Sequence, residues 1–209
     1  MSVYLEQLFD DLNIVRRVKE RMPSMFQLAE QESSRAGKIG MEVGSVRERI
    51  IIALLMYKYG EENVGTDLPI TESEADVLLF NERVSIKTIT GSLSGVKLTW
   101  TVDKERAKQF SKKYYPNIDI LLTQIVWKSK DGGFFYIPKE VQQKVYRKIG
   151  RGDYLKLPKV NTNPRGVELS KDALELMVAD SKSKKIKFLW KRGEVSHDIY
   201  GRWIELWKE

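Results

Sequence analysis

The chain has 209 residues, of which 42% are hydrophobic and 31% are charged. A chain of this length can bury one good-sized core, so we expect a single domain. No apolar run approaches the roughly 20 residues that a membrane-spanning helix needs, so a membrane protein is not expected. The chain contains no cysteine, which excludes disulfides, thiolate metal sites and thiol catalysis.

The balance of charge favours a polyanionic partner. Lys and Arg number 36 against 29 Asp and Glu, which gives a net charge of +7. A well-solvated basic surface would give the same balance, so the distribution of charge has to decide. Because the first residues carry no secretory signal and the chain lacks cysteine, we expect an intracellular protein.

The first 44 residues predict a helical extension followed by a loop. Apolar residues recur at three- and four-residue steps over residues 3–33, and Pro23 interrupts the pattern, so we expect two helices around a bend. Gly37, Gly40 and Gly44 then follow close together, at a density that regular structure tolerates poorly. We therefore expect a loop before the next helix.

Residues 45–127 predict a compact helix and strand unit. Ser45 and Glu48 have the spacing of a capping box, and the helix behind them ends at Gly60. The strand-like segments that follow are NVGTDL, ADVLLF, ERVSIKTIT and, after a Gly-rich stretch, VKLTWTV. Asn81 and Glu82 separate two of these segments as a hairpin turn would.

The end of this unit predicts one more helix and a central strand. An acidic start and a basic end indicate a helix over residues 103–115. The nearly continuous apolar run over residues 117–127 is typical of a strand buried on both faces. The order of elements is therefore helix, strand, strand, strand, helix, strand.

Residues 128–209 predict further strands and helices and a basic segment. The expected elements are a hairpin at KDGG, a helix at PKEVQQKVYRKIG, an extended YLKLPKV, a turn at NTNPRG, a capped helix at SKDALELMVADS and the basic run KSKKIKFLWKR. The single histidine, His197, has no partner for a zinc site or a nucleophile elbow in this pattern. We expect it to be an ordinary surface residue.

Asp76 and Lys87 are the main candidate catalytic residues. In a strand, residues two apart share a face, so Ser85 and Lys87 project to one side while Val84 and Ile86 project into the core. A hairpin turn would bring Asp76 beside them. A carboxylate can hold a hard divalent cation, and an ammonium can orient the attacking water, which is what phosphodiester hydrolysis requires.

Each of these residues also has a purely structural explanation. A lysine buried in an apolar strand is costly without a partner, and Asp76 could be that partner in an ion pair with no function. Glu48 could be half of a capping box and nothing more. The two roles of Glu48 are compatible with each other.

TESEADVLLF followed by ERVSIKTIT resembles the core of the PD-(D/E)XK nuclease superfamily, and the order of elements over residues 45–127 matches it. The resemblance implies an α/β fold with a central mixed β-sheet flanked by helices. It implies Asp76 as the metal-binding aspartate and Lys87 as the motif lysine of a Mg²⁺-dependent enzyme. Two features depart from the pattern: Glu74 and Ala75 replace the proline region, and Ser85 stands where a second acidic residue is expected.

Another carboxylate is therefore needed at the site. Serine at position 85 cannot supply negative charge, although we count it among the catalytic residues by its place in the motif. Some members of the superfamily draw a glutamate from the first core helix, which makes Glu48 the first candidate for a metal ligand beside Asp76. Glu74, two residues before Asp76 and hence on its side of a strand, is the second.

Phosphate contacts call for basic and hydroxyl side chains on flexible backbone. Three segments meet this description: the glycine-rich stretch before the Glu48 helix, the segment TGSLSGVK, and NPRG with the basic run that follows later. Met41 could wedge between base pairs, although a core methionine is the simpler reading. The residues that we expect to contact DNA are Lys38, Met41, Ser92, Ser94, Lys97, Arg165, Lys184 and Lys185.

The stretch LPKVNTNPRGVELSKDALELM resembles segments of small Type II restriction endonucleases, in particular the ThaI-like cutters of CGCG sites. This resemblance implies a prokaryotic cytoplasmic homodimer that cuts double-stranded DNA to blunt ends with 5′-phosphates. A repair or junction-resolving nuclease on the same fold is an alternative. A non-catalytic DNA-binding module, which the serine at position 85 would suit, is another.

Overall fold

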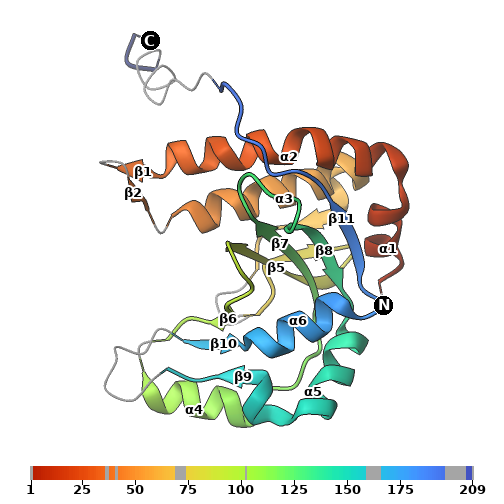
Figure 1. Cartoon of the computed structure of the whole chain (residues 1–209), viewed down its shortest axis with the longest axis vertical. Coiled ribbons are helices and arrows are strands. Elements are labelled where there is room, and N and C mark those ends of the chain that lie inside the picture. The colour runs from red at the N-terminus through yellow and green to blue at the C-terminus, as the bar shows by residue number, and fades with distance from the viewer. Residues whose placement is uncertain are drawn as a thin grey trace.

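A six-stranded mixed sheet forms the centre of the computed structural model, which describes residues 2–35, 38–40, 42–68, 74–101, 103–158, 166–195 and 206–208 (Figure 1). Its strands in spatial order are β11 (Lys184–Lys187), β8 (Gly133–Ile137), β7 (Asp119–Ile125), β5 (Glu82–Thr90), β4 (Val77–Leu79) and β3 (Val64–Gly65). Only β5 and β7 run parallel among these neighbours. The α/β class with a central mixed sheet is confirmed.

Strand β7 is buried along its whole length, as its apolar run predicts. Leu121 packs into the hydrophobic cluster on one face of the sheet, while Ile120 and Leu122 pack into the cluster on the other. This alternation places a separate apolar core on each side of the sheet. The two cores hold β5, the strand of Lys87, between them.

Three helices cover one face: α1 (Val3–Asp10), α2 (Leu12–Glu32) and α3 (Val43–Tyr59). The predicted break at Pro23 is wrong, because Pro23 lies inside α2 between the buried side chains of Met22 and Phe26. The break is at Asp11, whose side chain caps α2 by accepting hydrogen bonds from the backbone N–H groups of Asn13 (2.9 Å) and Ile14 (3.2 Å). Burial of the flanking residues outweighs the helix-breaking tendency of proline.

Two helices and a second sheet cover the other face (Figure 1). The helices are α5 (Lys139–Tyr154) and α6 (Lys171–Ala179), and the three-stranded antiparallel sheet consists of β6 (Val96–Thr99), β10 (Val167–Leu169) and β9 (Leu155–Lys156). Helix α4 (Lys104–Lys113) contacts β10. The predicted cap of α6 is confirmed, because Ser170 accepts from Ala173 N (3.1 Å). Helix α4 is also capped, by Asp103, which accepts from Glu105 N (2.8 Å).

Two predictions next to the Glu48 helix are wrong. The expected loop contains a short antiparallel pair, β1 (Ser34–Arg35) with β2 (Lys38–Ile39). Helix α3 begins at Val43, so Ser45 lies inside it and caps nothing, and the capping-box explanation of Glu48 fails. The first helical turn accommodates Gly44, where flexibility is least harmful.

The turn between β4 and β5 is one residue earlier than predicted. Phe80 and Asn81 both have positive φ, 48° and 64°, and Leu79 pairs with Glu82. A two-residue hairpin turn with positive φ at both positions matches the twist of the flanking strands. This tight turn sets the register that brings the residues before β4 beside β5. A short 3₁₀ helix, η1 (Glu61–Asn63), links α3 to β3.

No helix in the described part of the chain combines the length and the apolar character that crossing a bilayer requires. The C-terminal segment contributes β8 and β11 to the same sheet as β4 and β5. The single-domain organisation and its division at residues 44 and 127 stay predictions.

Candidate active site

Asp76 and Lys87 meet where the β4–β5 hairpin opens. Asp76 lies in the bend just before β4, and its backbone N–H donates to the carbonyl of Val84 (2.9 Å), which holds it against β5. Lys87 Nζ donates to Asp76 Oδ2 at 3.0 Å. The same oxygen accepts from Ser85 Oγ (3.1 Å) and from the backbone N–H of Ile86 (2.5 Å). Asp76 is therefore fixed by three donors from one strand.

The predicted alternation along β5 is confirmed. Ser85 and Lys87 both reach Asp76, whereas Val84 and Ile86 belong to the apolar cluster under the first three helices. Ser85 is only 4% exposed, and its hydroxyl donates to Asp76 without lining the pocket. Its place in the structure is thus that of a residue that orients the aspartate.

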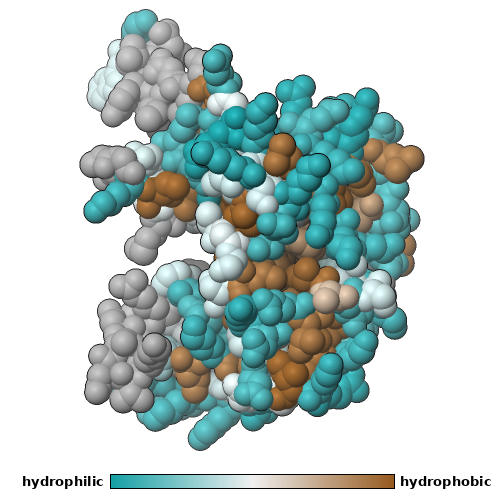
Figure 2. Space-filling model, in the orientation of Figure 1, coloured by the Kyte–Doolittle hydropathy of each residue, from teal (hydrophilic) through white to brown (hydrophobic). Residues whose placement is uncertain are grey.

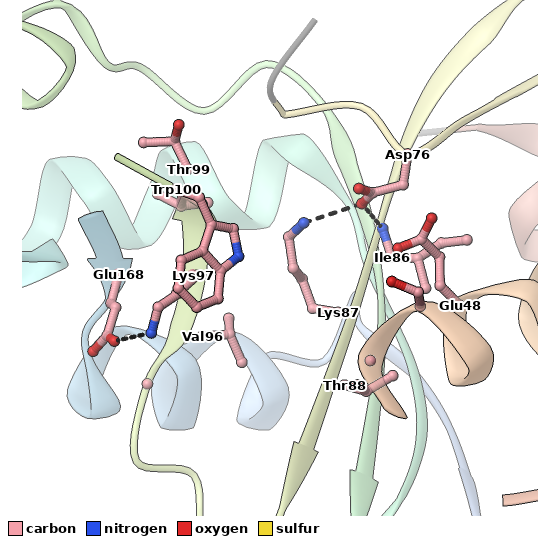
Figure 3. A pocket seen from close by; sticks show the side chains of 14 residues that line it. Glu48, Asp76, Ile86, Lys87, Thr88, Val96, Lys97, Thr99, Trp100 and Glu168 are labelled. Carbon is pink, nitrogen blue, oxygen red and sulfur yellow. Dashed lines mark hydrogen bonds and ion pairs between the residues drawn. The ribbon is translucent and has the colours of Figure 1, made fainter. Parts of the chain in front are cut away.

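Glu48 faces the same pocket from α3, as Figure 3 shows. Burial raises the pKa of the Glu48 carboxyl, and the negative charge of Asp76 raises it further, while Lys87 and Arg49 oppose the shift. Glu48 and Asp76 thus place two carboxylates on the lining of one pocket. Glu48, Asp76 and Lys87, three of the four catalytic residues that we predicted, line this one pocket.

Glu74 is not brought to this pocket. Strand β4 starts only at Val77, so the argument that residues two apart share a strand face does not apply to positions 74 and 76. Glu74 instead lines a separate depression with Tyr114 and Lys113. Burial raises the pKa of the Glu74 carboxyl, and the positive charges of Lys87 and Arg83 lower it.

The pocket, about 540 Å³ in volume, has a second wall made by the three-stranded sheet. There Lys97 Nζ donates to Glu168 Oε1 (3.0 Å) and lies 4.5 Å from the centre of the Trp100 ring. Figure 3 shows these side chains across the pocket from Lys87. In Figure 2 the molecule is hollowed between the part built from α2 and α3 and the part built from β6 and β10. The candidate site lies in a cleft between the two sheets.

Comparisons with known proteins identify the family of the chain that forms this cleft. A family model described as restriction endonuclease ThaI matches residues 8–209. The chain belongs to the ThaI restriction endonuclease family. A solved structure described as "Restriction endonuclease in complex with substrate DNA" is 54% identical to it, with a TM-score of 0.91 over 98% of this chain and 99% of that chain. None of the curated proteins matches this chain.

Membership of the ThaI family implies a divalent metal cofactor, and the pocket fits one. All three hydrogen bonds to Asp76 within the described residues go to Oδ2, which leaves Oδ1 directed to no protein donor among them. The described residues contain no cluster of three or more histidine or acidic side chains. Two carboxylates are enough for Mg²⁺, which keeps several of its waters and binds through one or two carboxylates.

The DNA contacts predicted for this ThaI-family chain lie in different places. Lys38, Ser92 and Ser94 are exposed, and Lys97 lines the cleft. Lys184 pairs with Asp10 (3.0 Å) on the outer strand β11, and neither it nor Lys185 lines the pocket. Met41, Arg165 and His197 lie outside the described residues.

Sequence reasoning did not find Trp100 and Glu168 as pocket residues. Glu168 lies on β10 of the second sheet and Trp100 directly follows β6, and no motif marks either residue. The one available signal is a large aromatic side chain, Trp100, at the end of a strand-like segment that follows the glycine-rich stretch after β5.

Proposed function

We propose that this restriction endonuclease hydrolyses phosphodiester bonds with Mg²⁺ held by Asp76 and Glu48. The observation that carries the proposal is the convergence of two carboxylates and one ammonium, that of Lys87, in one cleft. The chain belongs to a family of Type II site-specific deoxyribonucleases, and these three groups meet the needs of that chemistry.

Each of the three side chains has a distinct part in the proposal. Asp76 is held by β5 through Oδ2, so that Oδ1 serves as the ligand atom. Glu48 supplies the carboxylate that serine at position 85 cannot. When bound, the cation polarises a phosphate oxygen and stabilises charge on the leaving oxygen. Lys87, beside Asp76, donates hydrogen bonds to the attacking water or to the phosphate and orients the reacting atoms.

We further propose that the substrate is double-stranded DNA bound in the cleft between the two sheets. The support is the net charge of +7, Lys97 on the cleft wall, and a 54% identical structure whose title names substrate DNA. We propose cutting at CGCG to give 5′-phosphates, by a homodimer in the prokaryotic cytoplasm. Two active sites related by a two-fold axis suit a palindromic site.

A digest of mapped plasmid DNA with magnesium, with calcium or with EDTA tests the proposal. Discrete bands with magnesium and none with EDTA are the expected result, and their ends identify the sequence that is cut. If the enzyme cleaves only branched junctions, it is a structure-specific nuclease and the proposal is wrong. Binding of DNA without cutting in any metal would replace it with a non-catalytic module.

A further inference from the structure

Trp100 is an exposed aromatic side chain on the cleft wall that the proposed hydrolysis does not use. It is 67% exposed and follows directly after β6, across the pocket from Lys87 (Figure 3). A large apolar ring such as that of tryptophan contributes strongly to binding when a ligand covers it. Its position on the rim of the candidate active site suggests that the substrate does so.

The indole ring is held in place before any substrate binds. The Lys97 ammonium lies 4.5 Å from the ring centre, and Glu168 Oε1 accepts a hydrogen bond from the same ammonium at 3.0 Å. Lys97 and Glu168 are both largely shielded, with side chains 26% and 29% exposed. A ring ordered in advance loses less freedom when a ligand covers it, which favours binding.

The chemistry of this wall matches DNA. A cation beside an aromatic face is the combination by which proteins hold nucleic acid, since the ring covers apolar sugar or base surface and the cation lies near phosphate. A duplex whose phosphate reaches Lys87 on one wall has to pass the opposite wall of the same cleft. The net charge of +7 favours the same ligand.

We propose that Trp100 is a DNA-contact residue whose ring packs on deoxyribose next to the phosphate that is cut. Lys97, beside the ring, lies near the neighbouring phosphate, and Glu168 positions Lys97. This inference rests on the proposed function, because it requires DNA to lie in the cleft.

The test compares Trp100→Ala and Trp100→Phe with a matched control, Tyr57→Ala. Tyr57 is also an exposed ring (60%) with a cation over it, Arg17 Cζ at 5.1 Å, but it lines a groove between α2 and α3. Affinity for a short duplex that contains the cleavage site is measured with calcium in place of magnesium. Tryptophan fluorescence is recorded in the same titration.

Trp100→Ala should weaken DNA binding roughly tenfold, as loss of a central tryptophan does at interfaces, while Tyr57→Ala should leave it unchanged. Trp100→Phe should keep most of the affinity and lose the fluorescence change that the wild type shows on binding. Affinity of Trp100→Ala within twofold of the wild type, or an equal loss in Tyr57→Ala, would overturn the inference.

Two further readouts keep the result interpretable. Trp100→Phe retains a ring and reports by fluorescence alone, so the test stands even if Trp100→Ala unfolds. If Trp100→Phe shows the same fluorescence change on DNA binding as the wild type, the inference is overturned. A wild-type protein that neither binds nor cuts DNA would overturn the proposed function itself, whereas a wild type that cuts normally beside an unaffected Trp100→Ala overturns only the role of Trp100.

Discussion

At the scale of single residues, one carboxylate oxygen organises the site. Asp76 Oδ2 accepts from a lysine, a serine and a backbone amide, all of them on β5. Charge-assisted hydrogen bonds of this kind fix the orientation of a carboxylate. The aspartate is thus prepared to offer its other oxygen to a cation, with Lys87 beside it.

Replacing Lys87 with alanine should lower the rate of cleavage about 10² to 10³-fold, the loss typical when one stabilising donor is removed from an active site. DNA affinity should change little, because the Lys87 side chain is 13% exposed and is paired with Asp76. Single-turnover cleavage and equilibrium binding measure the two effects. Lys144 contacts Asp180 (2.7 Å) and does not line the pocket, so Lys144→Ala is the control and should cut normally. Cleavage by Lys87→Ala at the wild-type rate would contradict the assignment of Lys87 to the active site.

The sequence predicted the proximity of Asp76 and Lys87 better than it predicted their local structure. Asp76 and Lys87 follow from the alternation of β5 and the short turn before it, and those are local features. Asp76 nevertheless lies before β4, and Ser85 faces Asp76 as a donor. Trp100 and Glu168 reach the pocket through the pairing of β6 with β10, a contact between segments distant in sequence that no local pattern reveals.

At the scale of elements, a buried ionic cluster ties α2, α3 and the segment after β11 together. Glu30 is 3% exposed and accepts hydrogen bonds from Arg47 (2.7 Å), Arg192 (2.5 Å) and Trp127 Nε1 (2.9 Å). Arg47 also donates to Thr90 Oγ1 (3.1 Å) at the end of β5. Arg47 directly precedes Glu48 in α3, so the cluster places the helix that carries Glu48 relative to the strand that carries Lys87.

Glu30→Gln should destabilise the fold by about 3 kcal/mol or more, because it leaves a buried guanidinium without its counter-charge. The midpoint of urea unfolding measures the change. Lys108→Met is the matched control: it removes the exposed pair of Lys108 with Glu105 (2.8 Å) on α4 and should leave the midpoint where it is. Equal midpoints for Glu30→Gln and the wild type would show that the cluster does not stabilise the fold.

The junction between α1 and α2 should give a pH-dependent contribution to stability. A hydrogen bond from Lys58 lowers the pKa of Asp11 below its usual 3.8, and the backbone N–H of Ile14 adds to the shift. A lowered pKa in the folded state means that the stabilisation is complete above the usual value and is lost as pH falls through the lowered one.

Asp11→Asn keeps the cap and removes the charge, so it isolates this effect. The wild type should unfold at a higher temperature than Asp11→Asn at about pH 7, and the difference should shrink by about pH 3. Thermal unfolding of both proteins at the two values checks it. If the difference in unfolding temperature is the same at both pH values, the charge of Asp11 is not its cause.

The elements themselves were largely predictable where a local rule decides them. Strand β5 follows from alternation and β7 from continuous apolarity. Helix α4 follows from its acidic start and basic end, and α6 from its capping serine. Pro23 misleads because tertiary packing keeps α2 helical on both sides of it. Strand β10 was missed because its three residues show too little pattern, and only pairing with β6 and β9 makes it a strand.

At the scale of the whole molecule, the two sheets border the cleft that holds the proposed catalytic groups, and the described residues of one chain contain one such group of side chains. Cutting both strands of a palindrome in one binding event then calls for two chains. We expect light scattering to give the mass of two chains at working concentration. Supercoiled plasmid should convert directly to linear DNA. A monomeric mass together with accumulating nicked circles would contradict the homodimer.

The central claim is that Glu48 completes the site in place of the acidic residue missing at position 85. Single-turnover cleavage by Glu48→Gln and Glu74→Gln at equal Mg²⁺ concentrations tests it most directly, because both glutamates are partly buried near Lys87 and only Glu48 lines the pocket with Asp76. We expect the rate of Glu48→Gln to fall about 100-fold or more, and that of Glu74→Gln to stay within a few-fold of the wild type. A normal rate for Glu48→Gln, or a greater loss for Glu74→Gln, would contradict the account.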